Sequence, residues 1–183
     1  PAEQETPEEP QAATQEPPAE TEPAEEEQPG EGEMGEAETP EPPSEEVEYA
    51  RALWTEIEGY SEWTQPEGFQ GWQEGQSPHG SILKYYINMA AEEDLTKDGA
   101  IIVKENYTEE SEDALASVTI MQKREGYDPE TENWFYVKYS PEGEVMSNPA
   151  GVKLAGLAGK GKDQGCIPCH AAAGGGDYLF MND

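Results

Sequence analysis

The sequence predicts a mainly β, α+β domain built on an antiparallel sheet and preceded by a disordered acidic tail. All four Trp, nine Tyr and three Phe lie beyond residue 48. Within that part of the chain, four segments rich in β-branched and aromatic residues follow one another between turn signals. Its length is that of one ordinary domain. Residues 47–183 are therefore expected to form a single domain.

The first 46 residues cannot build a core. Residues 1–48 contain 18 glutamates, no Lys or Arg and no aromatic residue, and ten of the chain's 16 prolines precede residue 44. Such a segment buries too little apolar surface to offset the entropy lost on ordering it. Residues 1–46 are therefore expected to be a disordered, Glu- and Pro-rich tether.

The net charge of −31 argues against one class of partner. With the 18 glutamates of the tail set aside, 23 of the 41 acidic residues oppose 10 basic ones. A surface of this sign repels the phosphates of nucleic acid. A basic redox partner protein or a small molecule is compatible with it. The chain also has no run of about 18 apolar residues, so no membrane span is predicted.

One helix and one long loop are predicted before the strands. Ser44 is placed to cap a helix with an acidic first turn. Apolar residues then recur at helical spacing from Val47 to Tyr60. Residues 61–80 are rich in Gly, Gln and Pro, with aromatic residues between them, which is typical of a loop pinned to the domain.

Four strands are predicted, at residues 82–89, 100–107, 116–123 and 133–139. Turn residues separate them, as in Lys97-Asp98-Gly99 and Pro141-Glu142-Gly143. A short helix is expected at residues 90–95. Strands that follow one another this closely form an antiparallel sheet.

The segment that carries the chemistry is Cys166-Ile167-Pro168-Cys169-His170, which precedes only 13 further residues. In Cys-x-x-Cys-His, the two thiols add to the vinyl groups of haem and the histidine becomes an axial ligand of the iron. Both cysteines of the chain and one of its two histidines lie here. A redox dithiol usually occurs in a βαβ setting, and a zinc site needs further Cys or His ligands. The sequence therefore predicts one haem c, held by Cys166 and Cys169, with His170 bound to its iron.

Covalent attachment of haem takes place outside the cytoplasm, so an extracytoplasmic location is expected, in the periplasm or cell envelope. A targeting segment is expected to have preceded Pro1. The acidic stretch would suit the spacer of a lipid-anchored protein, with the anchor on the removed segment.

The opposite face of the iron has several candidate ligands. Met181 lies only 11 residues beyond His170, while Met89, Met121 and Met146 are typical of packing residues. His79 is the other strong ligand, although a loop histidine bonded locally explains it equally well. We expect an iron that is five-coordinate, or only weakly capped, and open to a small ligand. A sixth ligand from His79 or a Met would instead indicate an electron-transfer cytochrome.

Other segments accompany the haem motif: Asp98–Glu105 (DGAIIVKE), Met121–Arg124 (MQKR), Gly126–Asp128, Asn133–Phe135 and Asp177–Phe180 (DYLF). With them, residues 47–183 resemble the cytochrome P-460 family, which includes the β-sheet cytochromes c′. The resemblance implies an antiparallel sheet with helices at its ends and a homodimer. It also implies that the C-terminal segment binds the haem, with a distal pocket facing the sheet.

The resemblance also implies one catalytic residue. In family members that oxidise hydroxylamine, a lysine is cross-linked to the porphyrin, and by position that lysine would be Lys104. The strand period places Ile102, Lys104 and Asn106 on one face. A solvent-facing strand lysine is the ordinary alternative, and Lys123, at a strand end, is the second candidate.

An oxidation would also need a proton acceptor near the iron. Glu125, Asp128 and His79 are candidates, whereas Glu105 alternates to the face opposite Lys104. The chain would then be a haem-dependent oxidoreductase.

The other branch of the family covers its distal side with apolar aromatic residues and binds nitric oxide or carbon monoxide. Phe69, Trp72 and Phe135 are the candidates for that role here. Three functions therefore stay open: hydroxylamine oxidation or nitric oxide binding at a five-coordinate haem, gas sensing without turnover, and electron transfer.

Overall fold

The computed structural model describes residues 44–182. Most of the predicted tether, residues 1–43, lies outside the described residues, and residues 44–46 belong to the cap and first turn of a helix. Among residues 44–182, no helix combines the length and the apolar character that a membrane span requires.

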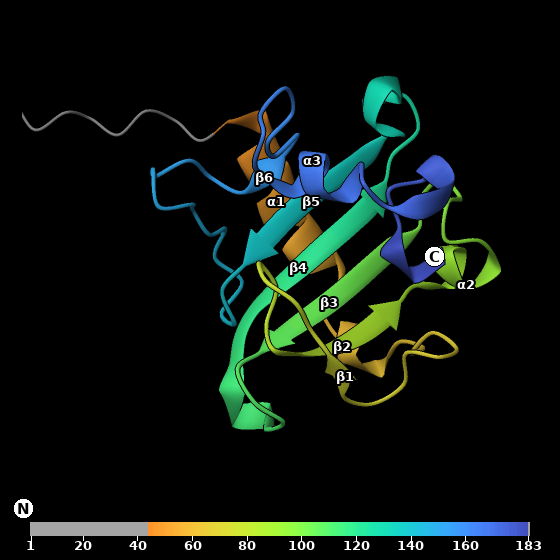
Figure 1. Ribbon diagram of the computed structural model, residues 1–183, viewed down its shortest axis with the longest axis vertical. Helices are drawn as coiled ribbons and strands as arrows, with labels where there is room; N and C mark the ends of the chain where they lie inside the picture. The colour runs from red at the N-terminus through yellow and green to blue at the C-terminus, as the bar shows by residue number, and fades with distance from the viewer. Residues whose placement is uncertain (1–43, 183) are drawn as a thin grey trace, which may run out of the picture. The chain divides into compact units, whose positions relative to one another are not determined.

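The centre of the fold is an antiparallel sheet in which neighbouring strands follow chain order (Figure 1). Each strand pairs antiparallel with the next. The predicted fold class, a mainly β, α+β domain with an antiparallel sheet, is thereby confirmed. The strands are β1 Gln73–Glu74, β2 Ile82–Ile87, β3 Ile101–Tyr107, β4 Leu115–Lys123, β5 Trp134–Tyr139 and β6 Ala155–Gly156.

The four central strands occur where the sequence predicted them, with ends that differ by one or two residues. The two outer strands were not predicted. Each of them contains only two residues, too few to show an alternating pattern. The predicted loop over residues 61–80 therefore contains β1.

Three α-helices accompany the sheet within the described residues: α1 Glu45–Glu56, α2 Met89–Glu93 and α3 Cys166–His170. The predicted cap is confirmed, because the Ser44 side chain accepts a hydrogen bond from the Val47 amide at 3.4 Å. Short 3-10 helices occupy Tyr60–Glu62, Glu112–Ala114, Pro129–Thr131, Gly174–Gly176 and Phe180–Asn182.

The two faces of the sheet bury different sets of side chains. In Figure 1, α1 lies behind the sheet, whereas α3 and the C-terminal segment lie in front of it. Leu53 and Ile57 of α1 pack in the cluster that contains Val103 of β3. Ile167 of α3 packs in the cluster that contains Ile102. Successive side chains of one strand thus point to opposite layers, and Lys104 lies on the α3 side.

Replacement of Leu53 by Ala tests the α1 layer. Leu53 is 1% exposed, so the truncation removes apolar contacts and leaves a cavity. The expected loss is about 2–5 kcal/mol of unfolding free energy, measured by urea denaturation of the full chain. The control is Arg51→Ala on the exposed side of the same helix, expected to change stability by about 0.5 kcal/mol or less. Equal effects of the two changes would contradict this packing.

Candidate functional site

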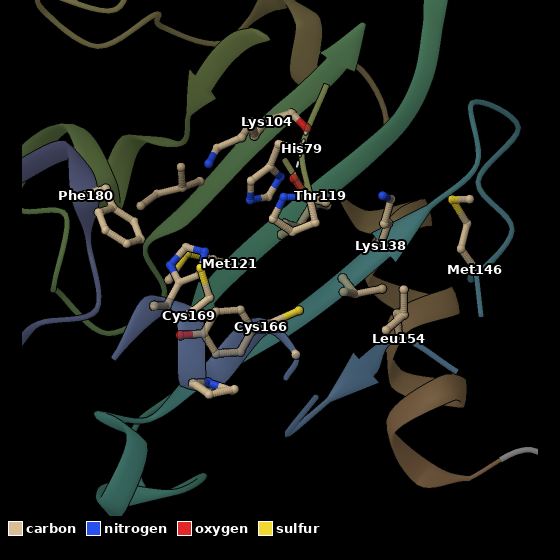
Figure 2. Close-up of a pocket in the computed structure, with 18 of the residues that line it drawn as sticks. His79, Lys104, Thr119, Met121, Lys138, Met146, Leu154, Cys166, Cys169 and Phe180 are labelled. Atoms are coloured by element: carbon tan, nitrogen blue, oxygen red, sulfur yellow. Dashed lines mark hydrogen bonds between the residues drawn. The ribbon is translucent and has the colours of Figure 1, made fainter. Parts of the chain in front are cut away.

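A cavity of about 650 Å³ lies between the sheet and α3. Its walls include Lys104 and Lys138 from the sheet and Cys166, Cys169 and His170 from α3. Cavities of about 300–1,000 Å³ enclose small-molecule ligands and cofactors. Figure 2 shows Cys166 and Cys169 entering this space from the α3 side, Lys104 entering it from a strand of the sheet, and His79 entering it from a loop.

The sheet contributes a continuous row of side chains to the cavity. Tyr85, Lys104, Thr119 and Lys138 are register partners across β2, β3, β4 and β5. All four line the cavity. The Lys104 ammonium lies 5.2 Å from the centre of the Tyr85 ring. The prediction that Lys104 lies on a strand is thus confirmed, and its partly buried side chain faces the cavity between the sheet and α3.

Burial has a direct effect on the Lys104 amine. It lowers the pKa of Lys104 to about 8, whereas the charge of an ionised Cys169 sulfur acts in the opposite direction. Low-dielectric surroundings disfavour the charged form. Within residues 44–182, Lys104 makes no side-chain hydrogen bond or ion pair. Compared with an ordinary lysine, a larger fraction of this amine is therefore neutral at neutral pH and has its lone pair available for bond formation.

A close backbone approach positions α3. Gly165 caps the helix with a φ of 134°. A Cβ on this residue would meet the Gly159 Cα at 2.6 Å, so only glycine fits there. The Ile167 amide donates to the Ala158 carbonyl at 3.1 Å, and the Ile167 side chain is buried against the sheet. The thiols of the two cysteines, which form no disulfide, are left facing the cavity.

The His170 ring is held by the C-terminal segment. Its Nδ1 lies 2.9 Å from the Tyr178 carbonyl oxygen. A carbonyl only accepts, so Nδ1 carries the hydrogen and Nε2 carries a lone pair. Tyr178 has a φ of 66°, a conformation that costs about 1–3 kcal/mol in a bulky residue. Burial lowers the pKa of His170, which keeps the imidazole neutral.

His79 enters the same cavity from the loop that precedes β2. Its Nδ1 lies 3.1 Å from the Asn106 Oδ1 atom, 27 residues away. Burial, followed by the charges of Lys104 and His170, lowers the pKa of His79 to about 3. Its ring centre is 6.3 Å from that of His170, and the two ring planes are nearly perpendicular, at 87°. The hydrogen bond between His79 and Asn106 therefore joins residues far apart in the sequence. It is not the local bond considered for a loop histidine.

Several residues considered in the sequence do not line the cavity. The Lys123 ammonium lies 3.8 Å from the Glu132 carboxylate and 5.0 Å from the centre of the Trp134 ring. Glu125 and Asp128 are also absent from the walls of this cavity. Of the proposed proton acceptors, only His79 lies there.

Of the three aromatic residues considered for a distal cover, one lines the cavity and two do not. Phe69 lines the cavity, with its ring centre 5.1 Å from that of Tyr85. Trp72 packs against Tyr107 at 4.9 Å, outside the cavity lining. Phe135 belongs to the cluster under α1.

The structure adds wall residues that the sequence analysis did not select as site residues. From the sheet come Thr119, Met121, Tyr136 and Lys138, and from the C-terminal segment comes Phe180. Thr119 and Lys138 are register partners in the row that contains Lys104. Because side chains alternate along a strand, Met121 and Tyr136, each two residues away from one of these partners, lie on the same face. Phe180 has its ring centre 5.5 Å from that of His170. This contact depends on the turns between His170 and Phe180, which leave no periodic pattern in the sequence.

Two observations test whether these residues suit a haem. The Tyr136 hydroxyl is buried, lines the cavity and has no hydrogen-bond partner within the described residues. An unsatisfied buried hydroxyl costs about 1–3 kcal/mol, which favours a polar partner from outside the chain. Within residues 44–182, no group of three or more His, Cys, Asp or Glu side chains could hold a metal ion without further ligands. The thiols, the free imidazole nitrogen and the apolar walls fit a porphyrin better than a metal bound by protein alone.

An antiparallel sheet with one face turned toward a Cys-x-x-Cys-His helix defines the class of this protein as a haem-binding cytochrome. The sequence model of the family Cytochrome P460 matches residues 57–181, and the chain belongs to this family. The predicted family and its cofactor, one covalent haem c with its iron, are thereby confirmed. A search of curated proteins finds no match to the chain.

An ion pair fixes the segment that leads into α3. The Lys160 ammonium lies 2.6 Å from Asp128 and 2.9 Å from Glu130. Asp128 also accepts a hydrogen bond from the Thr131 hydroxyl at 2.6 Å. The bond from Lys160, followed by that from Thr131, lowers the pKa of Asp128 below its usual 3.8. The hairpin between β4 and β5 thereby holds the approach to the cysteines.

Replacement of Asp128 by Asn tests this attachment. A carboxyl whose pKa is lowered by folding stabilises the protein above its unfolded pKa, and the contribution disappears as the pH falls through the lowered value. The variant should therefore be less stable than wild type at neutral pH, with a difference that shrinks below about pH 4. Urea denaturation across this range measures it.

The matched control for Asp128→Asn is Glu130→Gln. Glu130 contacts the same ammonium, but its side chain is 81% exposed, so its loss should matter less. A stability difference for Asp128→Asn that stays constant down to acidic pH would contradict the ion-pair assignment.

Proposed function

We propose that Cys166 and Cys169 hold the haem, that His170 Nε2 binds its iron, and that the protein oxidises a small nitrogen compound such as hydroxylamine. The observation that carries the reaction is the position of Lys104. Its amine lies in the same cavity as both thiols and His170, in surroundings that lower its pKa to about 8. This is the placement that the resemblance to hydroxylamine-oxidising family members requires for a lysine attached to the porphyrin.

The chain's own residues provide attachment, orientation and exclusion of water. When bound, the haem supplies a redox-active iron that accepts electrons from the substrate and passes them to a partner. The Tyr178 carbonyl fixes the direction of the His170 lone pair. Phe69 and Ile102 are among the apolar residues that line the cavity, and such walls strengthen electrostatic interactions inside it. Together these features favour a buried reaction site for a small substrate.

A second function is nitric oxide binding without turnover. The observation in its favour is aromatic cover, because Phe69 and Phe180 both line the cavity. These aromatic rings accept a small apolar ligand and are not themselves proton acceptors. The state of Lys104 separates the two functions, since a gas-binding site does not need its amine.

The setting of this activity is also a proposal. Covalent attachment of haem supports an extracytoplasmic location. The excess of 23 acidic over 10 basic residues after residue 48 supports a basic redox partner, whose association would weaken with salt. A homodimer is supported by the resemblance to the family.

The linkage to Lys104 is tested by mass spectrometry of haem peptides after proteolysis under denaturing conditions. The reaction proposed here predicts that a peptide containing Lys104 stays attached to the haem together with the peptide Cys166–His170. Lys104→Arg should lose that attachment, because the guanidinium remains protonated. Lys138→Arg, on the same row and two strands away, is the matched control and should retain it. Haem on the Cys166–His170 peptide alone would favour nitric oxide binding.

Replacement of His170 by Ala tests the iron ligand. Both cysteines remain, so covalent attachment should survive while the axial bond from this side is lost. The ferrous absorption spectrum should therefore change strongly, and the mass of the chain should still include one haem. An unchanged spectrum in this variant would contradict the assignment of His170.

A further inference from the structure

We propose that His79 Nε2 occupies the iron position opposite His170 when no substrate is bound, so that a small ligand must displace it. The proposal rests on the haem attachment proposed above. It changes the expected resting state from five-coordinate to a six-coordinate haem with two histidine ligands. The entry of ligand is then controlled by this chain and not only by the size of the cavity.

The first step concerns the tautomer of His79. The Asn106 amide nitrogen donates to the Lys104 carbonyl at 3.1 Å and to the Ser117 carbonyl at 3.1 Å. Both partners only accept, so this end of Asn106 is the NH₂ group and the end facing His79 is the oxygen. The oxygen accepts the hydrogen of His79 Nδ1. His79 Nε2 therefore carries a lone pair, as a metal ligand must.

The second step concerns the distance between the two imidazoles. An imidazole nitrogen binds a first-row transition metal ion at about 2.0 Å, so two rings on opposite sides of one ion have their centres about 6 Å apart. The centres of His79 and His170 are 6.3 Å apart. The nearly perpendicular ring planes, at 87°, are compatible with this arrangement because each ring can rotate about its bond to the metal. A separate ligand placed between iron and His79 would need a wider gap.

The third step concerns the support of His79. The next residue, Gly80, crosses the end of β3 so closely that a Cβ would lie 2.4 Å from the Tyr107 carbonyl oxygen. On the other side, the Gly75 amide donates to the Ser81 carbonyl at 2.8 Å. Contact with β3 thus fixes the loop that carries His79. The side chain of Asn106, which is 1% exposed, fixes the imidazole ring. A histidine supported in this way loses little further entropy on binding a metal.

Displacement has a measurable consequence. If the open state makes up about 1% of the molecules, the apparent affinity for a distal ligand falls about 100-fold below its intrinsic value. Removal of the His79 imidazole should restore that affinity. This change in ligand affinity can be measured without turnover. Carbon monoxide is a suitable probe, because it needs only a ferrous iron with a vacant position.

The test uses the full haem-loaded chain and low-temperature electron paramagnetic resonance of its ferric form. Wild type should show a low-spin signal, and His79→Ala a high-spin signal. Added imidazole should restore the low-spin signal in the variant by occupying the vacated space. Carbon monoxide affinity in the ferrous variant should rise about tenfold or more. Gln76→Ala, in the same turn but with an exposed side chain, is the control and should behave as wild type.

Two results would overturn the proposal: a high-spin wild-type protein, or a His79→Ala variant that stays low-spin because Lys104 or a methionine is the ligand. If His79→Ala does not fold, His79→Gln keeps the side chain's size and a donor for Asn106 without an imidazole, and the same two criteria apply to it. Neither result depends on whether Lys104 is attached to the porphyrin. Failure of this proposal therefore leaves the mass-spectrometric test of the proposed function intact.

Discussion

The site depends most on the hydrogen bond between His170 Nδ1 and the Tyr178 carbonyl. It leaves Nε2 as the nitrogen with a free lone pair and fixes the direction of the ring. The residue that supplies this carbonyl, Tyr178, adopts a positive φ. The segment is held in place where the Trp134 indole donates to the Asp177 carbonyl at 2.9 Å. The last residues of the chain thus serve as the support of an axial ligand.

The two-layer arrangement explains why this site is compatible with a stable fold. Alternation along β3 sends Val103 into the hydrophobic cluster under α1 and Lys104 into the cavity on the other face. Glu105, next in the chain, points back to the α1 side and accepts hydrogen bonds from Tyr60 and Tyr107 at 2.8 Å. The α1 layer thus supplies hydrogen-bond donors for its own buried carboxylate, whereas the α3 layer presents Lys104, the two thiols and His170 to a cavity that suits a cofactor.

Sequence patterns predicted the parts of the molecule that have a local or periodic signal. The central strands alternate, Ser44 precedes an acidic helical turn, and Cys166–His170 is a contiguous motif. The environment of His79 had no such signal, because its partner Asn106 is 27 residues away and the loop that carries His79 has no regular period. Lys138 was overlooked although it shares a face with Tyr136, because its place in the cavity wall depends on its register with Thr119 across a strand pair. The short strands β1 and β6 exist only through pairing with longer neighbours.

The central claim is that the haem iron lies in the cavity between α3 and the sheet, bound to His170. The most direct test is X-ray diffraction from crystals of the haem-loaded protein at the iron absorption edge, which locates iron by its anomalous signal. We expect one iron peak within the cavity, bonded to His170 Nε2 at about 2.0 Å, with the porphyrin facing Lys104. An iron peak outside the cavity, or one without a bond to His170, would contradict this account.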